Sequence, residues 1–167
     1  GTNYAVLGRN LATGIGFVDT LNDPPIAALW RTPLYPVAIS ILYPLTGNAE
    51  TAARMVSLVC SCFLIWQVYY LMFRMIGRRA GLYTAALVAG YLPFVLSAVD
   101  TVTEPLYLCL FTLFVTLLWE TIREPARWRL PVVGVVVALM YLTRVEAIAY
   151  TLFAVAVVVF AYGRTDR

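Results

Sequence analysis

The sequence predicts an all-α integral membrane protein, with about four to five transmembrane helices and an interfacial helix in an outer loop. Of its 167 residues, 62% are hydrophobic and only 13% are charged, whereas a soluble domain has about 25% charged residues. The mean hydropathy is +0.81, and several uncharged runs approach the ~20 residues that cross a bilayer as a helix. This composition excludes a soluble globular enzyme, because too few charges remain to cover its surface, and it excludes a disordered chain.

The first part of the chain, residues 1–50, is expected to form an outer, periplasmic loop, and residues 51–167 the transmembrane region. Because the chain opens in a polar stretch, we expect a further spanning helix upstream of Gly1. Residues 33–46 are apolar, but a helix of this length spans only about 21 Å, less than a hydrocarbon core of about 30 Å. This run and its three prolines favour an interfacial or re-entrant helix, followed by a turn at residues 46–48.

Three longer apolar runs predict spanning helices, over residues 55–73, 80–99 and 105–119. Thr103 and Pro105 suit the start of the third helix, as a capping residue and as a first-turn proline. A basic loop at residues 123–129 separates the third run from the last one.

The last apolar stretch, residues 130–162, is interrupted by Arg144 and Glu146. It is either one tilted helix with a buried ion pair near its middle or two shorter helices that meet at a polar junction. The absence of Gly and Pro at the interruption favours one helix locally. The charge distribution favours two, because two helices return the C-terminal arginines to the side of Arg78 and Arg79.

Helices that alternate through the membrane separate the charges into two groups. The cytoplasmic side then carries most of the arginines and the outer side most of the acids, in agreement with the positive-inside rule. All twelve basic residues are Arg and the sequence has no His, which excludes His-based catalysis and His metal sites. The three cysteines, Cys60, Cys62 and Cys109, lie in apolar runs, and we interpret them as small buried hydrophobic residues.

If residues 130–162 form two helices, the outer face carries a set of five charged residues. Arg31 lies in the loop, Asp100 and Glu104 at a helix start, and Arg144 and Glu146 at the helix junction. Ionisable residues at membrane depth are costly and tend to be functional. Guanidinium groups bind phosphate in a bidentate manner, and a carboxylate can accept a proton from a hydroxyl. The set therefore suits a phosphorylated lipid substrate, with Glu104 and Asp100 as the candidate catalytic carboxylates. Each residue also has a structural interpretation, as an interfacial anchor, an acid at a helix N-terminus or half of an ion pair.

Four short segments follow one another in an order that matches a known superfamily. They are residues 2–14, which include Tyr4 and Arg9, and the segments Arg-Thr-Pro-Leu-Tyr-Pro (31–36), Thr-Glu-Pro-Leu (103–106) and Leu-Thr-Arg-Val-Glu (142–146). They resemble the first outer loop, the basic-x-Pro-Leu-Tyr segment, the Asp/Glu-Pro helix start and the Leu-Thr-Lys/Arg junction of the GT-C glycosyltransferases. The branch that they resemble includes protein O-mannosyltransferases and the aminoarabinose transferases of lipid A.

The resemblance implies a GT-C-like enzyme that transfers a sugar, with inversion, from a polyprenyl-phosphate donor to an acceptor on the outer side of the membrane. It implies that Arg31 and Arg144 hold the lipid phosphate and that Glu104 shapes the site beside them. Tyr4 and Arg9 would belong to the loop that supports the catalytic base, an acid that would fall immediately before Gly1. Tyr35 and Glu146 lie within the resembling segments and complete the expected substrate-binding set.

The expected partners are the membrane, the polyprenyl-phosphate lipid, an acceptor glycan, lipid or protein, and the rest of a larger membrane protein, but no nucleic acid. No cofactor is expected besides the lipid-linked sugar, and a divalent metal is left open. The expected location is the bacterial inner (plasma) membrane, as a multi-pass protein.

Two other classes of function stay open at this point. One is a non-catalytic membrane subunit that packs on a partner and binds lipid. The other is part of a transporter, with Arg144 and Glu146 along its path. Convergence of Arg31, Glu104 and Arg144 on one outer cavity would favour the transferase, whereas Arg144 and Glu146 at mid-membrane without Arg31 would favour the transporter.

Overall fold

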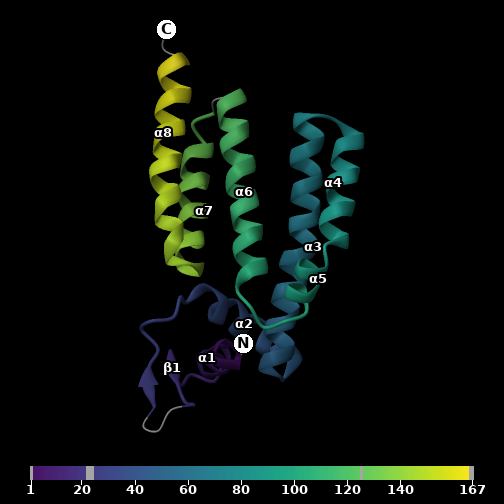
Figure 1. Ribbon diagram of the computed structural model, residues 1–167. Coiled ribbons are helices and arrows are strands. Elements are labelled where there is room, and N and C mark those ends of the chain that lie inside the picture. The colour runs from purple at the N-terminus through teal and green to yellow at the C-terminus, as the bar shows by residue number, and fades with distance from the viewer. Residues whose placement is uncertain (1, 22–24, 125, 166–167) are drawn as a thin grey trace.

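The computed structural model describes residues 2–21, 25–124 and 126–165 and shows an upright bundle of helices above a small layer (Figure 1). The layer contains α1 (Thr2–Ala12), the antiparallel strands β1 (Val18–Asp19) and β2 (Ile26–Ala27), and α2 (Leu34–Thr46). The bundle contains α3 (Ala49–Met75), α4 (Arg78–Gly90), α5 (Leu92–Ala98), α6 (Glu104–Arg123), α7 (Arg129–Thr143), the 3₁₀ helix η1 (Val145–Ala147) and α8 (Ile148–Thr165). The predicted all-α membrane fold is confirmed, with the two short strands as its one non-helical pairing among the described residues.

The bundle has two chemically different ends. We call the end that carries the layer, the loop 99–103 and the α7–α8 junction the loop end, and the end with the α3–α4 and α6–α7 turns the arginine end (Figure 1). The described charged residues of the arginine end are Arg74, Arg78, Arg79, Arg123, Arg127 and Arg129 with Glu120 and Glu124; those of the loop end are Arg9, Arg31, Arg54 and Arg144 with Asp19, Glu50, Asp100, Glu104 and Glu146. The expected separation of charge is thus present in the fold. Asp23, Asp166, Arg167 and the side chain of Arg164 lie outside the described part.

Two helices, α3 with 27 residues and α6 with 20, are long and apolar enough to cross a membrane. The helices α4 and α5 add a third span if the bent pair counts as one, and the other apolar helices of the described chain are shorter. The expected four to five spans therefore require α7 and α8 to cross as well. The 15 residues of α7 rise about 22 Å, which is less than a hydrocarbon core of about 30 Å.

Residues 80–99 do not form the single helix that the apolar run predicts. Helix α4 ends at Gly90, Tyr91 is extended with φ −75° and ψ 107°, and α5 starts at a bend of 67°. Pro93 lies in the first turn of α5, where its missing N–H needs no intrahelical acceptor. The proline therefore begins a new helix instead of continuing α4.

Residues 130–162 form two helices, as the charge distribution indicates. Helix α7 ends at Thr143, and Arg144 is extended, with φ −151° and ψ 128°, while its N–H donates to the carbonyl of Met140 at 2.8 Å. Neither Gly nor Pro marks this break. A continuous helix would carry Arg144 into the middle of an apolar segment at a high desolvation cost, and the break keeps its guanidinium at the loop end.

Helix α2 fastens the layer to the bundle. Its Tyr35 and Ile39 are fully buried in a cluster with Ala52 and Ala53 of α3. A Cβ at Gly8 of α1 would collide with the side chain of Ile39, so the missing side chain lets α1 approach α2 closely. This contact sets the height of α1 beneath the bundle.

The predicted turn after α2 is confirmed. Gly47 ends the helix in the left-handed region, with φ 64°, and the side chain of Asn48 caps α3 by accepting the N–H groups of Glu50 and Thr51 at 2.9 and 3.2 Å. Thr103, by contrast, precedes α6 with helical dihedral angles and makes no side-chain cap, so the prediction for this residue is wrong.

The apolar interior of the bundle consists of two clusters. Phe114, Met140 and Ala147 are at the centre of the cluster between α6, α7 and α8, and Leu64, Phe94 and Cys109 join α3, α5 and α6. Cys109 is buried and Cys60 partly buried, whereas Cys62 is exposed on α3, so the interpretation as a buried residue is wrong for Cys62.

Candidate functional site

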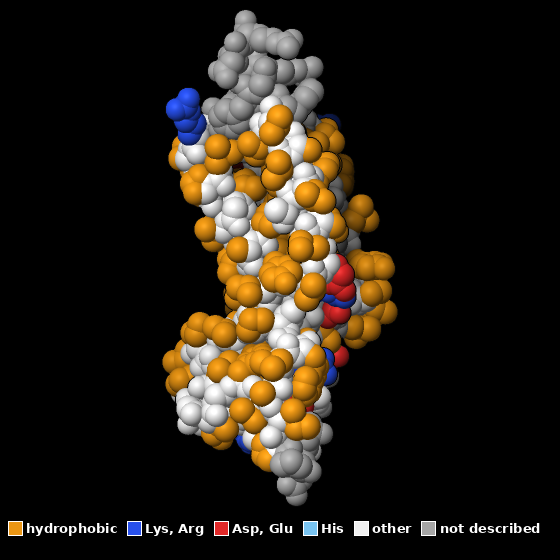
Figure 2. Space-filling model, turned by 90° about the vertical axis from the view of Figure 1, so that its left-hand side faces the viewer, with side chains coloured by type: hydrophobic (Ala, Val, Ile, Leu, Met, Phe, Trp, Pro, Cys, Tyr) orange, Lys and Arg blue, Asp and Glu red, His pale blue; other side chains and the backbone are white. Residues whose placement is uncertain are grey.

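A polar pocket of about 280 Å³ lies at the loop end, where the layer meets the bundle. Figure 2 shows acidic and basic side chains gathered between these two parts, on a face that is otherwise largely apolar. The lining comes from α1, the segment before α2, the start of α6 and the α7–α8 junction: Tyr4, Trp30, Arg31, Thr32, Thr103, Glu104, Thr143, Arg144, Val145 and Glu146. The fold thus brings Arg31, Glu104 and Arg144 to one cavity.

Arg144 is held from three sides. Its Nη1 lies 3.6 Å from Oε1 of Glu104, and its Nε donates to Oε2 of Glu146 at 3.2 Å. Its guanidinium carbon lies 5.6 Å from the ring centroid of Tyr107, which is a cation–π distance. Because Glu104 and Tyr107 are one turn apart on α6 and Glu146 belongs to η1, the guanidinium is oriented by both α6 and η1.

Arg31 is held differently. Its guanidinium carbon lies 5.1 Å from the ring centroid of Tyr4, and it forms no ion pair with a carboxylate of the described residues. Tyr4 itself rests edge-to-face on Tyr35, with the ring centroids 5.7 Å apart. Arg31 therefore presents a positive charge to the pocket that no described carboxylate neutralises.

One hydrogen bond joins the two arginine-bearing segments. The hydroxyl of Thr32 donates to the carbonyl oxygen of Thr143 at 2.8 Å. This carbonyl lies in the last turn of α7, where no further helical N–H follows in register to donate to it. Since Thr32 follows Arg31 and Thr143 precedes Arg144, the bond fixes both guanidinium-bearing residues to the same pocket.

Tyr35 lies beneath the pocket and does not line it. Its side chain is fully buried, and its hydroxyl donates to the carbonyl of Ala53 at 3.1 Å and lies 3.0 Å from Oγ of Ser57. Burial raises the pKa of Tyr35 to about 12, so the hydroxyl stays protonated at physiological pH. The ring of Tyr35 packs against the ring of Tyr4. Because Tyr35 does not line the pocket, it is not placed to contact a substrate directly.

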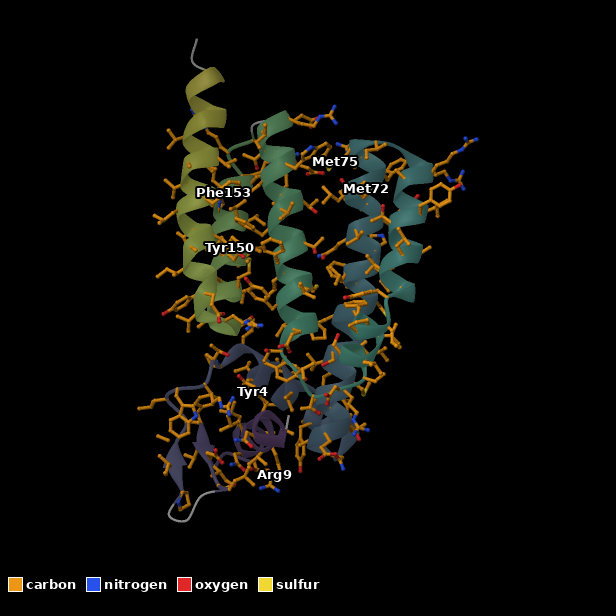
Figure 3. All side chains as sticks on the ribbon, in the orientation of Figure 1. Tyr4, Arg9, Met72, Met75, Tyr150 and Phe153 are labelled. Carbon is orange, nitrogen blue, oxygen red and sulfur yellow. The ribbon has the colours of Figure 1, made fainter. Side chains whose placement is uncertain are left out.

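Two other expected site residues lie elsewhere. Arg9 is exposed on the side of the layer that faces away from the bundle, opposite to Tyr4 (Figure 3). It lines a separate cavity of about 350 Å³ with residues such as Tyr43 and Glu50. Asp100 is exposed in the loop before α6, and its carboxylate accepts the N–H of Thr101 at 2.7 Å, so it is not part of the polar pocket.

The structure adds three residues that the sequence analysis did not single out: Thr32, Thr143 and Tyr107. Thr32 and Thr143 are the neighbours of the two arginines, and Tyr107 follows Glu104 by three residues, the spacing of side chains on one helix face. Their proximity in sequence to Arg31, Arg144 and Glu104 could have identified all three residues as part of the site. No group of three His, Cys, Asp or Glu side chains within the described ranges is placed to hold a metal ion.

Comparison with known proteins identifies one family. Residues 30–166 match the family model described as dolichyl-phosphate-mannose-protein mannosyltransferase. The matched segment includes Arg31, Glu104, Arg144 and Glu146 of the pocket. No curated protein and no solved structure matches the chain.

Proposed function

Because the chain belongs to the dolichyl-phosphate-mannose-protein mannosyltransferase family, a family of membrane glycosyltransferases, we propose that its polar pocket binds the phosphate of an isoprenoid-phosphate sugar donor. The observation that carries this proposal is the convergence of Arg31 and Arg144 on one cavity at the loop end. Two guanidinium groups on one cavity suit a phosphate, which each can bind in a bidentate manner. The presence of Arg31 beside Arg144 favours this function over a transport path at mid-membrane.

The pocket suggests a distinct task for each charged residue. Arg31 and Arg144 hold the phosphate and stabilise the negative charge that develops on it as the leaving group. Glu104 and Glu146 are already engaged by Arg144, so we assign them the positioning of this guanidinium. Asp100, which lies outside the pocket, receives no role in the reaction.

The proposed reaction is a single displacement at the anomeric carbon. A hydroxyl of the acceptor forms the new bond to this carbon from the side opposite to the phosphate, while the bond between carbon and phosphate oxygen breaks. The configuration inverts, and the hydroxyl proton passes to a carboxylate. In the branch that the sequence resembles, this carboxylate is the acid that would fall just before Gly1. We place the reaction on the outer side of the membrane, with a glycan, lipid or protein as acceptor.

The proposal is tested by binding of farnesyl phosphate, a short isoprenoid phosphate, to the intact protein in detergent. Replacing Arg31 or Arg144 by Ala removes a charge-assisted contact worth about 1.5–3 kcal/mol, so each variant should bind about 10- to 100-fold more weakly. Arg54→Ala is the matched control, because Arg54 is exposed at the same end and pairs only with Glu50. Unchanged affinity in both pocket variants would remove the phosphate assignment.

A further inference from the structure

The arginine end carries positive charge that its described acids do not balance. Its two described acids, Glu120 and Glu124, both pair with Arg129, whose Nη2 lies 3.5 and 3.9 Å from their carboxylate oxygens. The other five arginines of this end are exposed and form no ion pair with a carboxylate of the described residues: Arg74, Arg78, Arg79, Arg123 and Arg127. The arginine end therefore presents a cluster of charge that attracts an anion.

One of these arginines brings the two basic turns together. Nη1 of Arg123 donates to the carbonyl oxygen of Arg74 at 3.4 Å, so the last turns of α3 and α6 meet at the same end of the bundle (Figure 1). The guanidinium carbon of Arg123 also lies 4.9 Å from the ring centroid of Trp119, a cation–π distance. A carbonyl and a ring thus orient this guanidinium without neutralising it, and it keeps further N–H donors for another acceptor.

Arg74 and Arg123 lie at the depth of a membrane surface. From Arg54 to Arg74, α3 rises about 30 Å, and from Glu104 to Arg123, α6 rises about 28 Å. A hydrocarbon core is about 30 Å thick, so both arginines reach one surface when the loop end lies at the other. Exposed apolar side chains adjoin them in sequence on the two helices: Phe73, Met75 and Ile122.

We propose that the ends of α3 and α6 form a binding site for the head group of an anionic phospholipid, with Arg74 and Arg123 on its phosphate. The phosphates of a bilayer lie just outside its hydrocarbon core, which is the depth of these guanidinium groups, and guanidinium groups bind phosphate in a bidentate manner. Basic sites between membrane-spanning helices bind lipid head groups in this manner. We call this the head-group site; it does not involve the polar pocket and does not depend on the proposed function.

Two features of the head-group site select its occupant. The exposed Phe73 and Ile122 offer an apolar surface to the acyl chains below a bound phosphate, which an acidic soluble protein would not use. The uncompensated charge favours a lipid with a net negative head group, because phosphatidylcholine brings a quaternary ammonium group that the arginines repel. A bound phosphate would also reduce the repulsion between Arg74 and Arg123 and so hold the ends of α3 and α6 together.

The first experiment compares two phospholipids with the same acyl chains, dioleoylphosphatidylglycerol and dioleoylphosphatidylcholine. Their binding to the intact protein in detergent is measured by native mass spectrometry. The protein should bind phosphatidylglycerol about tenfold more tightly or better, because each arginine near an anionic head group adds to the attraction. Equal affinity for the two lipids would overturn the proposal.

A pair of double variants separates a site from an effect of net charge. Arg74→Gln with Arg123→Gln should weaken phosphatidylglycerol binding about tenfold or more and leave phosphatidylcholine binding unchanged. Arg9→Gln with Arg54→Gln is the matched control, because it removes the same charge from two exposed arginines of the loop end, and it should bind phosphatidylglycerol like the original protein. An equal loss in both double variants would show that the lipid follows the net charge alone, and the head-group site would be wrong.

The second experiment uses the unsubstituted protein, so it does not depend on the folding of a variant. A phosphatidylglycerol with a photoreactive head group is irradiated with the protein, and the labelled peptides are identified by mass spectrometry. Labels within residues 73–79 and 119–124 that excess phosphatidylglycerol suppresses, and phosphatidylcholine does not, support the proposal. Labels confined to the loop end, or labels that both lipids suppress equally, contradict it.

Discussion

Arg31 and Arg144 face the same pocket but are prepared for an anion by different means. Arg144 lies between two carboxylates, and each of these partly exposed ion pairs contributes little to stability, about 1 kcal/mol or less. Their effect is to fix the direction of the guanidinium before a ligand arrives. Arg31 has the ring of Tyr4 instead, which attracts a cation without neutralising it. At the residue scale, therefore, Arg144 supplies orientation and Arg31 supplies uncompensated charge.

Tyr4→Leu should weaken farnesyl phosphate binding about two- to fivefold, because it removes a cation–π contact of about 0.5–1 kcal/mol from Arg31. Tyr4→Phe keeps the ring and should bind like the original protein, which makes it the matched control. The dissociation constant of farnesyl phosphate is measured for both variants. An equal loss in Tyr4→Phe would mean that the hydroxyl group, and not the ring, is what the site requires.

At the scale of the elements, the breaks and turns between helices decide where the charged side chains lie, which the apolar runs alone do not. The break at Arg144 brings the guanidinium into the polar pocket, and the break at Tyr91 turns α5 by 67° from the direction of α4. At the other end, Arg129 begins α7 and turns back onto α6, where its Nη1 donates to the carbonyls of Glu120 and Glu124 at 2.8 and 2.6 Å. These carbonyls lie at the C-terminus of α6, where a cation complements the helix dipole.

Arg129→Met should destabilise the fold by about 3–5 kcal/mol, because it leaves Glu120 without its cation in a place where little water reaches. The Arg129 side chain is 11% exposed, its Nη2 lies 3.5 Å from Oε2 of Glu120, and Tyr70 of α3 donates to the same carboxylate at 2.7 Å. The measurement is the melting temperature in detergent, with Arg127→Met as the control, since Arg127 is exposed in the same turn. Adding Glu120→Gln to Arg129→Met should recover part of the loss. Equal melting temperatures for Arg129→Met and the control would show that the buried cluster is not needed for stability.

Sequence patterns predicted the helices better than their ends. Hydropathy located α3 and α6 because long apolar runs have few alternatives in a membrane, and the order of the motifs anticipated that Arg31, Glu104 and Arg144 converge. The helix break before Pro93 was not predicted, because one proline hardly changes the mean hydropathy of a long uncharged run. Arg129 was assigned to a basic loop because nothing in a local pattern shows that a side chain folds back to helix carbonyls. Arg9 and Asp100 were placed with the site because sequence distance to a motif does not give the direction of a side chain.

At the scale of the whole molecule, the polar pocket and the separation of charge make the two ends of the bundle chemically different. The polar pocket, with Arg31, Glu104 and Arg144 in its lining, lies at the loop end. The arginine end carries the basic turns and the buried cluster at Arg129. Under the proposed function, a donor whose phosphate is bound in this pocket would present its sugar next to the layer. This geometry requires the loop end to face the compartment in which the acceptor is found.

The distribution of arginines predicts which compartment that is. Segments rich in Arg are retained on the cytoplasmic side, and the arginine end has six described arginines, Arg74, Arg78, Arg79, Arg123, Arg127 and Arg129, against Glu120 and Glu124. In a background with the three cysteines replaced by Ala, Glu50→Cys at the loop end should react with a membrane-impermeant maleimide in intact cells. Arg79→Cys should react only after the cells are opened, and both positions are exposed, so opened membranes provide the labelling control. The reverse pattern would place the pocket on the cytoplasmic side. The sugar would then be transferred before it crosses the membrane, and an outer acceptor would be ruled out.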